Sequence, residues 1–116
     1  MATNLLSHRY EGTGTAMSEA HILDSATDCQ IVSARLHLNA SNAVSDIFTV
    51  TVTCAADTDY ATVLDSIKKD MNGLTDYEGP NSGYLGPVIP KGDTVTFAWS
   101  NAGAKNWFLE VIIRAV

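Results

Sequence analysis

Short stretches in which apolar and polar residues alternate strictly are the feature that most constrains this chain. In residues 30–38, Val32, Ala34, Leu36 and Leu38 fall on one face, with Ser33, Arg35 and His37 on the other. Such an alternation at every second position is typical of a β-strand that buries one face. The same pattern returns in residues 46–54, 94–99 and 107–115. The sequence therefore predicts a protein built from β-sheet.

The apolar positions of these segments predict the core. We expect these side chains to be buried between two sheets: Leu36, Phe48, Val50, Val52, Val95, Phe97, Trp107, Leu109 and Val111. The other face of residues 46–54 carries Thr49, Thr51 and Thr53, a threonine ladder that suits a solvated sheet face. Turn residues at 39–42 and 101–106 predict that the segments on either side of each turn pair as hairpins.

The segments between these strands are less regular. In residues 59–72, helical spacing joins Val63, Leu64, Ile67 and Met71, whereas strand spacing joins Tyr60, Thr62 and Leu64. A short helix and a strand both remain open there. Residues 73–83 are rich in glycine and proline and are expected to be a loop. Residues 84–90 contain two prolines, which donate no ladder hydrogen bond, and are expected to form an edge strand at best.

The length and the turn spacing favour one antiparallel β-sandwich domain. The chain has 116 residues, which fits a single domain. Turn signals recur every 8–12 residues without strand–helix–strand alternation, and this favours an all-β sandwich or barrel. Residues 1–18 show little periodicity and are expected to form an extended N-terminal arm, with residues 19–116 as the sandwich. We expect the arm to lie against a sheet edge or a neighbouring subunit and to contribute to attachment.

The charge and hydropathy of the chain exclude some partners. The formal net charge is −6, and the basic residues are scattered. A phosphate backbone needs a cluster of Lys and Arg, so no nucleic-acid partner is expected. The longest apolar runs fall well short of the ~20 residues of a membrane span, and the first residues lack the apolar region of a secretory signal. We expect no membrane contact.

No motif in the sequence predicts a catalytic, cofactor or metal site. His8, His21 and His37 lack the spacing of metal ligands and are expected to be solvated surface residues. Asp57 and Asp59 alone are too few for calcium and are better explained as an acidic turn that caps its own backbone. Cys29 and Cys54 are expected to be either two buried thiols or a disulfide between neighbouring strands.

The order of features in the second half resembles a known family. Tyr60, Thr62, Val63 and Leu64 precede a loop, and a proline-containing segment at 87–90 leads to Gly92 and Asp93. An alternating aromatic strand then ends near Asn101, and a final strand carries Leu109, Val111 and Ile113. This order resembles small virion structural proteins of tailed bacteriophages. The resemblance covers about residues 30–116 and breaks at Lys68, Lys69 and Asp70, where those relatives are more strand-like.

The resemblance implies a jelly-roll-like sandwich that is not an enzyme and acts in capsid decoration or cementing. Its implied partners are the major capsid protein or other virion proteins, its location is the virion assembled in the host cytoplasm, and a homo-oligomer is expected, by analogy a trimer. The side chains that we expect to contact partners are Leu5, Leu6, Arg9, Tyr10, Tyr77, Tyr84, Phe108 and Ile112. The alternative is a carbohydrate- or receptor-binding module of a tail or fibre, which would stack sugars on exposed Tyr or Trp rings. Trp99 and Trp107 fit that role less well, because both fall in the core register.

Overall fold

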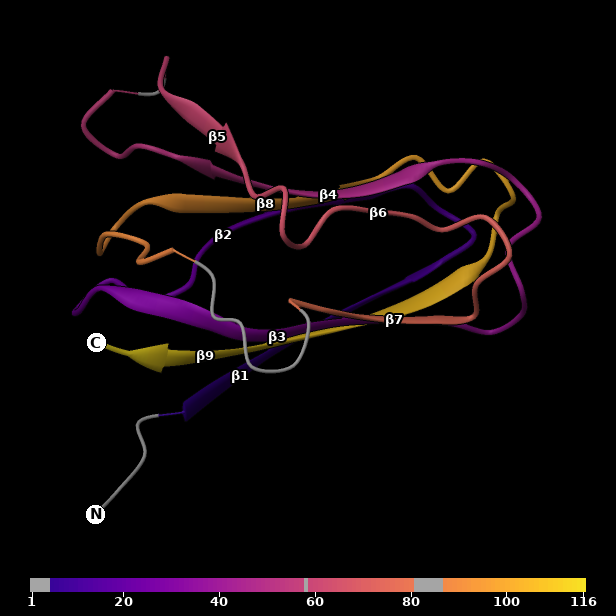
Figure 1. Ribbon diagram of the computed structural model, residues 1–116, viewed down its shortest axis with the longest axis horizontal. Coiled ribbons are helices and arrows are strands. Elements are labelled where there is room, and N and C mark those ends of the chain that lie inside the picture. Colours follow the sequence, from indigo (N-terminus) through magenta and orange to yellow (C-terminus); the bar gives the residue numbers. More distant parts are fainter. Residues whose placement is uncertain (1–4, 58, 81–86) are drawn as a thin grey trace.

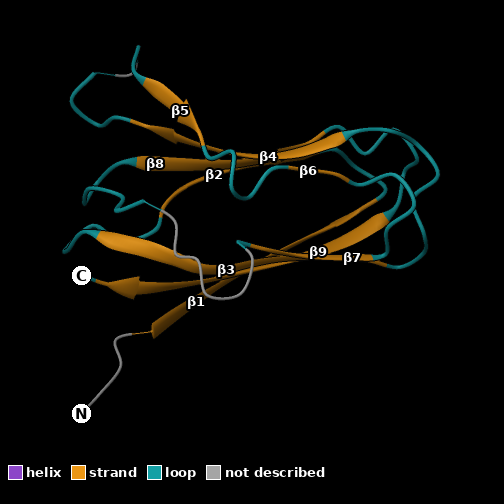
Figure 2. Cartoon of the chain, viewed as in Figure 1, coloured by secondary structure: helices purple, strands orange, loops and turns teal. Residues whose placement is uncertain are grey.

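The computed structural model describes residues 5–57, 59–80 and 87–116, and within these it contains β-strands and loops but no helix (Figure 1 and Figure 2). The strands stack as two antiparallel sheets, one above the other in Figure 1. The strand bounds are β1 Leu5–Thr13, β2 Met17–Ile22, β3 Cys29–Leu38, β4 Ile47–Thr53, β5 Ala61–Val63, β6 Lys69–Asp70, β7 Asp76–Gly79, β8 Thr94–Trp99 and β9 Asn106–Ala115.

The connections between the strands define a jelly roll. The first sheet has the order β1-β9-β3-β7 and the second β2-β8-β4-β5. Strand β6 pairs with the start of β4, while β5 pairs with its end, so β5 and β6 together act as one interrupted strand. Apart from the step from β4 to β5 and β6, each connection between successive strands crosses from one sheet to the other. The expected all-β, antiparallel, jelly-roll-like sandwich is therefore confirmed.

The two expected hairpins are wrong. Residues 30–38 lie in β3 of the first sheet and residues 46–54 in β4 of the second, and β8 and β9 are divided in the same way. Alternation shows which face of a strand is buried but does not show which sheet the strand joins. The intervening loops are long enough to cross the ~10 Å between packed sheets, so the length of the loop does not require a hairpin.

The sandwich interior contains the expected core. Eight of the nine side chains expected there are fully buried, with exposed fractions of 4% or less, and Val52 is half-buried. One register differs from expectation, because β3 has an irregularity between Ile31 and Ser33. This bulge turns Ile31 into the core and leaves Val32 half-buried.

The irregular middle of the chain is now assigned. Between β5 and β6 a turn, closed by the Ile67 N–H donating to the Leu64 carbonyl at 3.0 Å, buries both of these side chains. This turn explains why the apolar residues between Val63 and Met71 are spaced as in a helix. The loop expected at 73–83 contains strand β7, which pairs with β3 although its own sequence does not alternate. In the segment 84–90, residues 84–86 lie outside the described residues, and Ile89 makes a single bridge with Cys29.

The N-terminal stretch lies along an edge of the first sheet of its own chain. Strand β1 pairs with β9 from Leu5 opposite Arg114 to Thr13 opposite Asn106. Strand β2 begins at Met17, whose side chain is buried in the core. Residues 5–13 therefore supply the first strand of the jelly roll. A separate function for residues 1–18 as an arm stays a prediction.

A buried carboxylate ties together the loops at one end of the sandwich. Asp46 accepts hydrogen bonds from Trp99 Nε1 at 2.7 Å, from Asn42 Nδ2 at 3.0 Å and from the Ala102 N–H at 3.0 Å. These contacts join the loop before β4 to the end of β8 and the loop that follows it. The sequence did not single out Asp46.

Candidate functional site

The outer face of the first sheet is charged. Opposed residues of an antiparallel pair point to the same side, so the register assigns each side chain to a face. We call this surface the charged face; its ionisable side chains are Arg9, Glu11, Arg35, His37, Asp76, Glu78, Glu110 and Arg114. Its charges come from all the strands of the sheet.

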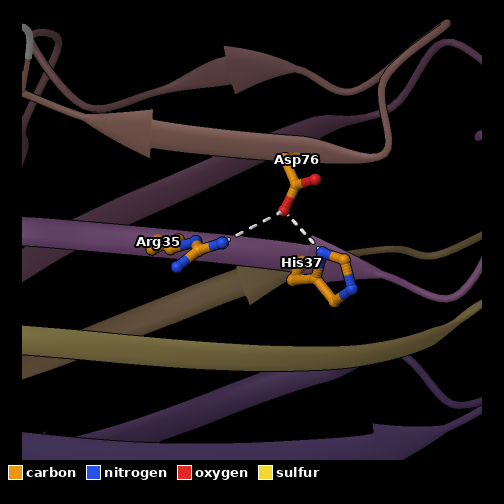
Figure 3. Close-up of polar contacts among 3 residues, drawn as sticks. All are labelled: Arg35, His37 and Asp76. Carbon is orange, nitrogen blue, oxygen red and sulfur yellow. Dashed lines mark hydrogen bonds and ion pairs between the residues drawn. The ribbon is translucent and has the colours of Figure 1, made fainter.

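Many of these charges are paired with one another. Arg9 Nε lies 3.0 Å from Glu110 Oε2 across β1 and β9. Asp76 of β7 lies between Arg35 and His37 of β3, hydrogen-bonded to His37 Nδ1 and 3.9 Å from Arg35 Nη2 (Figure 3). The His37 and Asp76 side chains are each about half exposed, 50% and 51%, so they form a solvated surface pair and not a buried catalytic dyad.

Phe108 stands out on the charged face. Its side chain is 37% exposed and lies between Glu11 of β1 and His37 of β3. Shallow hollows surround the ring: one is lined by Arg35 and His37, and another by Arg9, Tyr10 and Glu11. Among the described residues, the face therefore presents one phenyl ring within a border of polar groups.

The structure brings together only some of the side chains expected to contact partners. Leu5, Arg9, Phe108 and Ile112 share the charged face, whereas the half-exposed Leu6 points to the opposite side of the edge strand β1. Tyr84 lies outside the described residues.

Tyr10 and Tyr77 point inward instead. Tyr10 stacks on His21, with ring centroids 4.3 Å apart, and Tyr77 meets Phe48 edge-on at 6.3 Å. Burial raises the pKa of both phenols, and Glu19 raises the pKa of Tyr10 further. These two rings close the sides of the sandwich, so we leave them out of the contact surface proposed below.

The outer face of the second sheet carries less charge: no charged side chain points outward from β2, β8, β4 or β5, whereas Asp70 of β6 lies opposite Ile47 at its margin. We call this surface the uncharged face; it consists of Ser18, Ala20, Ile22, Ile47, Thr49, Thr51, Thr53, Ala61, Val63, Thr94, Thr96 and Ala98. Three exposed apolar side chains lie at its margins: Ile22, Ile47 and Val63, exposed by 51%, 54% and 45%. Sequence reasoning found only the threonines of β4, since the other members become neighbours only through strand pairing.

A small cavity opens at the end of the sandwich near the turn after β4. Its volume is about 250 Å³, and its lining includes Val52, Cys54, Tyr60 and Ile89. Asp93 joins the two loops around it by accepting a hydrogen bond from the Ala55 N–H at 2.9 Å. The lining is mostly apolar and contains no paired acid and base that would act on a substrate.

The two cysteines are not bridged, so the disulfide alternative is wrong. Cys29 is buried at the start of β3, and Cys54 is half-buried after β4 in the other sheet. Burial raises the pKa of the Cys29 thiol, and the carboxylates of Asp24 and Asp28 raise it further. Cys54 alone borders the cavity.

The remaining polar candidates take structural positions. His8 and His21 are half-buried, contrary to expectation: His8 Nε2 lies 3.1 Å from the Leu23 carbonyl and His21 Nε2 lies 3.0 Å from Glu19. Asp57 accepts the Asp59 N–H at 3.0 Å, which is the self-capped turn expected. Within the described ranges no three His, Cys, Asp or Glu residues are grouped to hold a metal ion. No helix in that part of the chain is long and apolar enough to cross a membrane.

Comparisons with known proteins place the fold. No model of a protein family matches the sequence, and no curated protein matches it. Among solved structures, a chain of the acidic stable capsid structure of Helicobacter pylori bacteriophage KHP30 aligns with a TM-score of 0.57 and 14% identity, covering 98% of this chain and 90% of that one. Chains of tomato aspermy virus (TM-score 0.38, 11% identity, 100% of this chain and 80% of that one) and of infectious bursal disease virus strain Gx (0.42, 16%, 98% and 29%) also align. Of these three structures, only the phage capsid chain has a TM-score above 0.5. It shows that this chain shares the fold of a chain of similar length found in a phage capsid.

Proposed function

We propose that this protein is a non-enzymatic structural component of a virion, which binds the capsid as a decoration or cementing protein. One observation carries the proposal: the whole jelly roll, and not a fragment of it, matches a phage capsid chain of similar length. The sequence resemblance to virion proteins of tailed phages supports the same role from residues 30–116. The partners are the major capsid protein or other virion proteins, and the site of action is the virion, assembled in the host cytoplasm.

The charged face is the surface that we propose for contact with the particle. An aromatic ring within a polar border is the composition that carries most of the binding energy in protein interfaces. Phe108 supplies the ring, Arg9 lies in the border, and Ile112 adds apolar area farther along β9, beyond Glu110. Leu5 and Leu6 lie on the adjoining edge strand, where residues 1–18 would act as an arm in attachment.

Self-association is part of the proposal. A small accessory domain gains avidity when it contacts a symmetric shell at several points, and on that ground the sequence-based expectation was a trimer. In the carbohydrate-binding alternative the ring for a sugar would come from Tyr60, which is 70% exposed, because Trp99 and Trp107 are only 1% and 4% exposed.

The experiment removes the ring that dominates the charged face. Phe108→Ser and the matched control Thr49→Ser, on the opposite outer face, are added to particles that lack this protein, and the bound fraction is measured by sedimentation. We expect Phe108→Ser to weaken binding about tenfold or more, while Thr49→Ser binds like the wild type. Equal binding by both variants, with both folded, would assign attachment to another surface.

A further inference from the structure

The cavity near the turn after β4 is an apolar hollow with one charged group in its wall. Asp93 is the one charged side chain among the described residues that line it, so none of these residues brings a positive charge. The apolar part of the lining comes from β4, from the turn after β5 and from the segment before β8: Val52, Leu64, Pro87, Val88, Ile89 and Pro90.

The Asp93 carboxylate is buried but has few hydrogen-bond partners. The residue is 8% exposed, and its Oδ1 accepts the Ala55 N–H at 2.9 Å. An ionised carboxylate can accept about four hydrogen bonds, and no donor among the described residues is bonded to its second oxygen, Oδ2. Burial of a charge costs free energy unless the charge is paired, so a cation inside the cavity would offset a cost that the fold already carries.

The loops around the cavity add to this negative charge. They lie at the end of the sandwich where the chain ends in Figure 1, and residues 23–28, 54–60 and 87–93 together carry five aspartates and one lysine. The Lys91 N–H donates to Asp28 at 2.9 Å and the Gly92 N–H to the Asp24 carbonyl at 3.2 Å, so two of the loops are held together. The electrostatic field at this end therefore attracts a cation and repels an anion.

An arginine side chain is the occupant that this chemistry fits. The cavity volume of about 250 Å³ is below the ~300–1,000 Å³ of most ligand pockets, so it suits one side chain. The stem of an arginine can pack on Leu64 and Ile89, while its planar guanidinium forms paired hydrogen bonds with the Asp93 carboxylate. Tyr60, which is 70% exposed, offers a ring on which a guanidinium stacks. An apolar side chain in the same place would leave Asp93 unpaired.

We propose that this cavity is a socket for an arginine side chain on the surface of a partner protein. The inference goes beyond the proposed function, because the socket lies at the end of the sandwich and uses no residue of the charged face. A partner with a basic surface also suits the formal net charge of −6.

The test measures binding of one arginine side chain by NMR titration of the ¹⁵N-labelled full chain. The probe is a capped glycine–arginine–glycine tripeptide, from about 0.1 to about 20 mM, the range of a weak single-site contact. A capped glycine–citrulline–glycine tripeptide is the matched ligand, because citrulline has nearly the same shape and no charge. Asp93→Asn removes the charge and keeps an oxygen for the Ala55 N–H, whereas Asp57→Asn removes an exposed charge outside the lining and is the matched variant.

We expect the arginine peptide to shift the amide signals of Ala55, Leu64 and Ile89 and to reach saturation. The citrulline peptide, and Asp93→Asn with the arginine peptide, should each bind about tenfold more weakly or worse, and Asp57→Asn should bind within about twofold of the wild type.

Three results would overturn the proposal. The first is an absence of shifts at these signals in the wild type, and the second is equal binding of the arginine and citrulline peptides, a comparison that needs no variant to fold. The third is binding of n-butylguanidinium more than about tenfold tighter than the arginine peptide, because the occupant would then be a small organic cation and not a protein side chain.

Discussion

Replacing Asp46 by alanine tests whether one carboxylate secures the loop end of the sandwich. The side chain is 8% exposed and accepts hydrogen bonds from Trp99 Nε1, Asn42 Nδ2 and the Ala102 N–H, at 2.7 to 3.0 Å. Trp99 and Asn42 are themselves buried, so their donors have little access to water after the carboxylate is removed.

The magnitude follows from the donors left without an acceptor. A buried donor without a partner costs about 1–3 kcal/mol. The backbone N–H of Ala102, whose residue is exposed, regains water, and Asn42 Nδ2 keeps its hydrogen bond to the Val44 carbonyl at 2.7 Å, so Trp99 Nε1 is the buried donor left without its acceptor. We therefore predict that Asp46→Ala lowers the free energy of unfolding by about 1–3 kcal/mol, a substantial part of the 5–15 kcal/mol typical of a domain.

Urea unfolding followed by tryptophan fluorescence measures this loss, with Trp99 as a reporter at the affected end. Asp46→Asn is expected to fall between the wild type and Asp46→Ala, because its amide oxygen still accepts from Trp99 while its NH₂ group faces other donors. Asp65→Ala, at an exposed carboxylate paired with Lys68, is the control and should unfold like the wild type. A loss below about 1 kcal/mol for Asp46→Ala would refute the reasoning.

Three further predictions concern the edge strand, the thiols and alkaline pH. Gly12→Ala places a Cβ about 2.4 Å from the Trp107 ring and should destabilise the fold by about 1–3 kcal/mol in urea titrations. Iodoacetamide followed by mass spectrometry should label Cys54 in the native protein and the buried Cys29 only after unfolding. The pKa of Tyr10 is raised above 10.0 in the folded state, so the neutral phenol contributes stability in full below pH 10, and this stability is lost as the pH rises further. Tyr10→Phe should therefore make the melting temperature depend less on pH above 10.

A specific result would contradict each of these predictions. Ser7→Ala changes an exposed position of the same edge strand and should be neutral, so equal effects of it and Gly12→Ala would show that contact with the ring is irrelevant. Labelling of Cys29 at the same rate as Cys54 would mean that the edge of β3 opens in the native state. An unchanged alkaline limb in Tyr10→Phe would assign the loss of stability to other groups.

The alternating segments were sufficient to predict the strands and the faces that they bury. In β8 and β9 the apolar positions Val95, Phe97, Leu109 and Val111 are all fully buried, because a buried face requires an apolar residue at every second position. The bulge in β3 could not be predicted, since Ile31 and Val32 are both apolar and either register satisfies the pattern.

The parts that sequence reasoning missed depend on contacts between distant residues. The hairpins were wrong because the same loop length serves a turn within one sheet and a crossing to the other. Strand β7 was missed because pairing with β3, and not its own pattern, makes it a strand. Asp46 looks like an ordinary turn residue until the fold brings Trp99, far away in the sequence, against it. The uncharged face appears only when β2, β8, β4 and β5 are placed side by side.

The measurement that tests the proposed virion role most directly is the copy number of this protein in virions purified from a lysate of cells that produce it. Quantitative mass spectrometry against the major capsid protein gives that number. The account predicts a fixed ratio that persists through gradient purification and matches the symmetry of the shell. Absence of the chain from purified particles, or a ratio that varies with washing, would contradict a structural role in the virion.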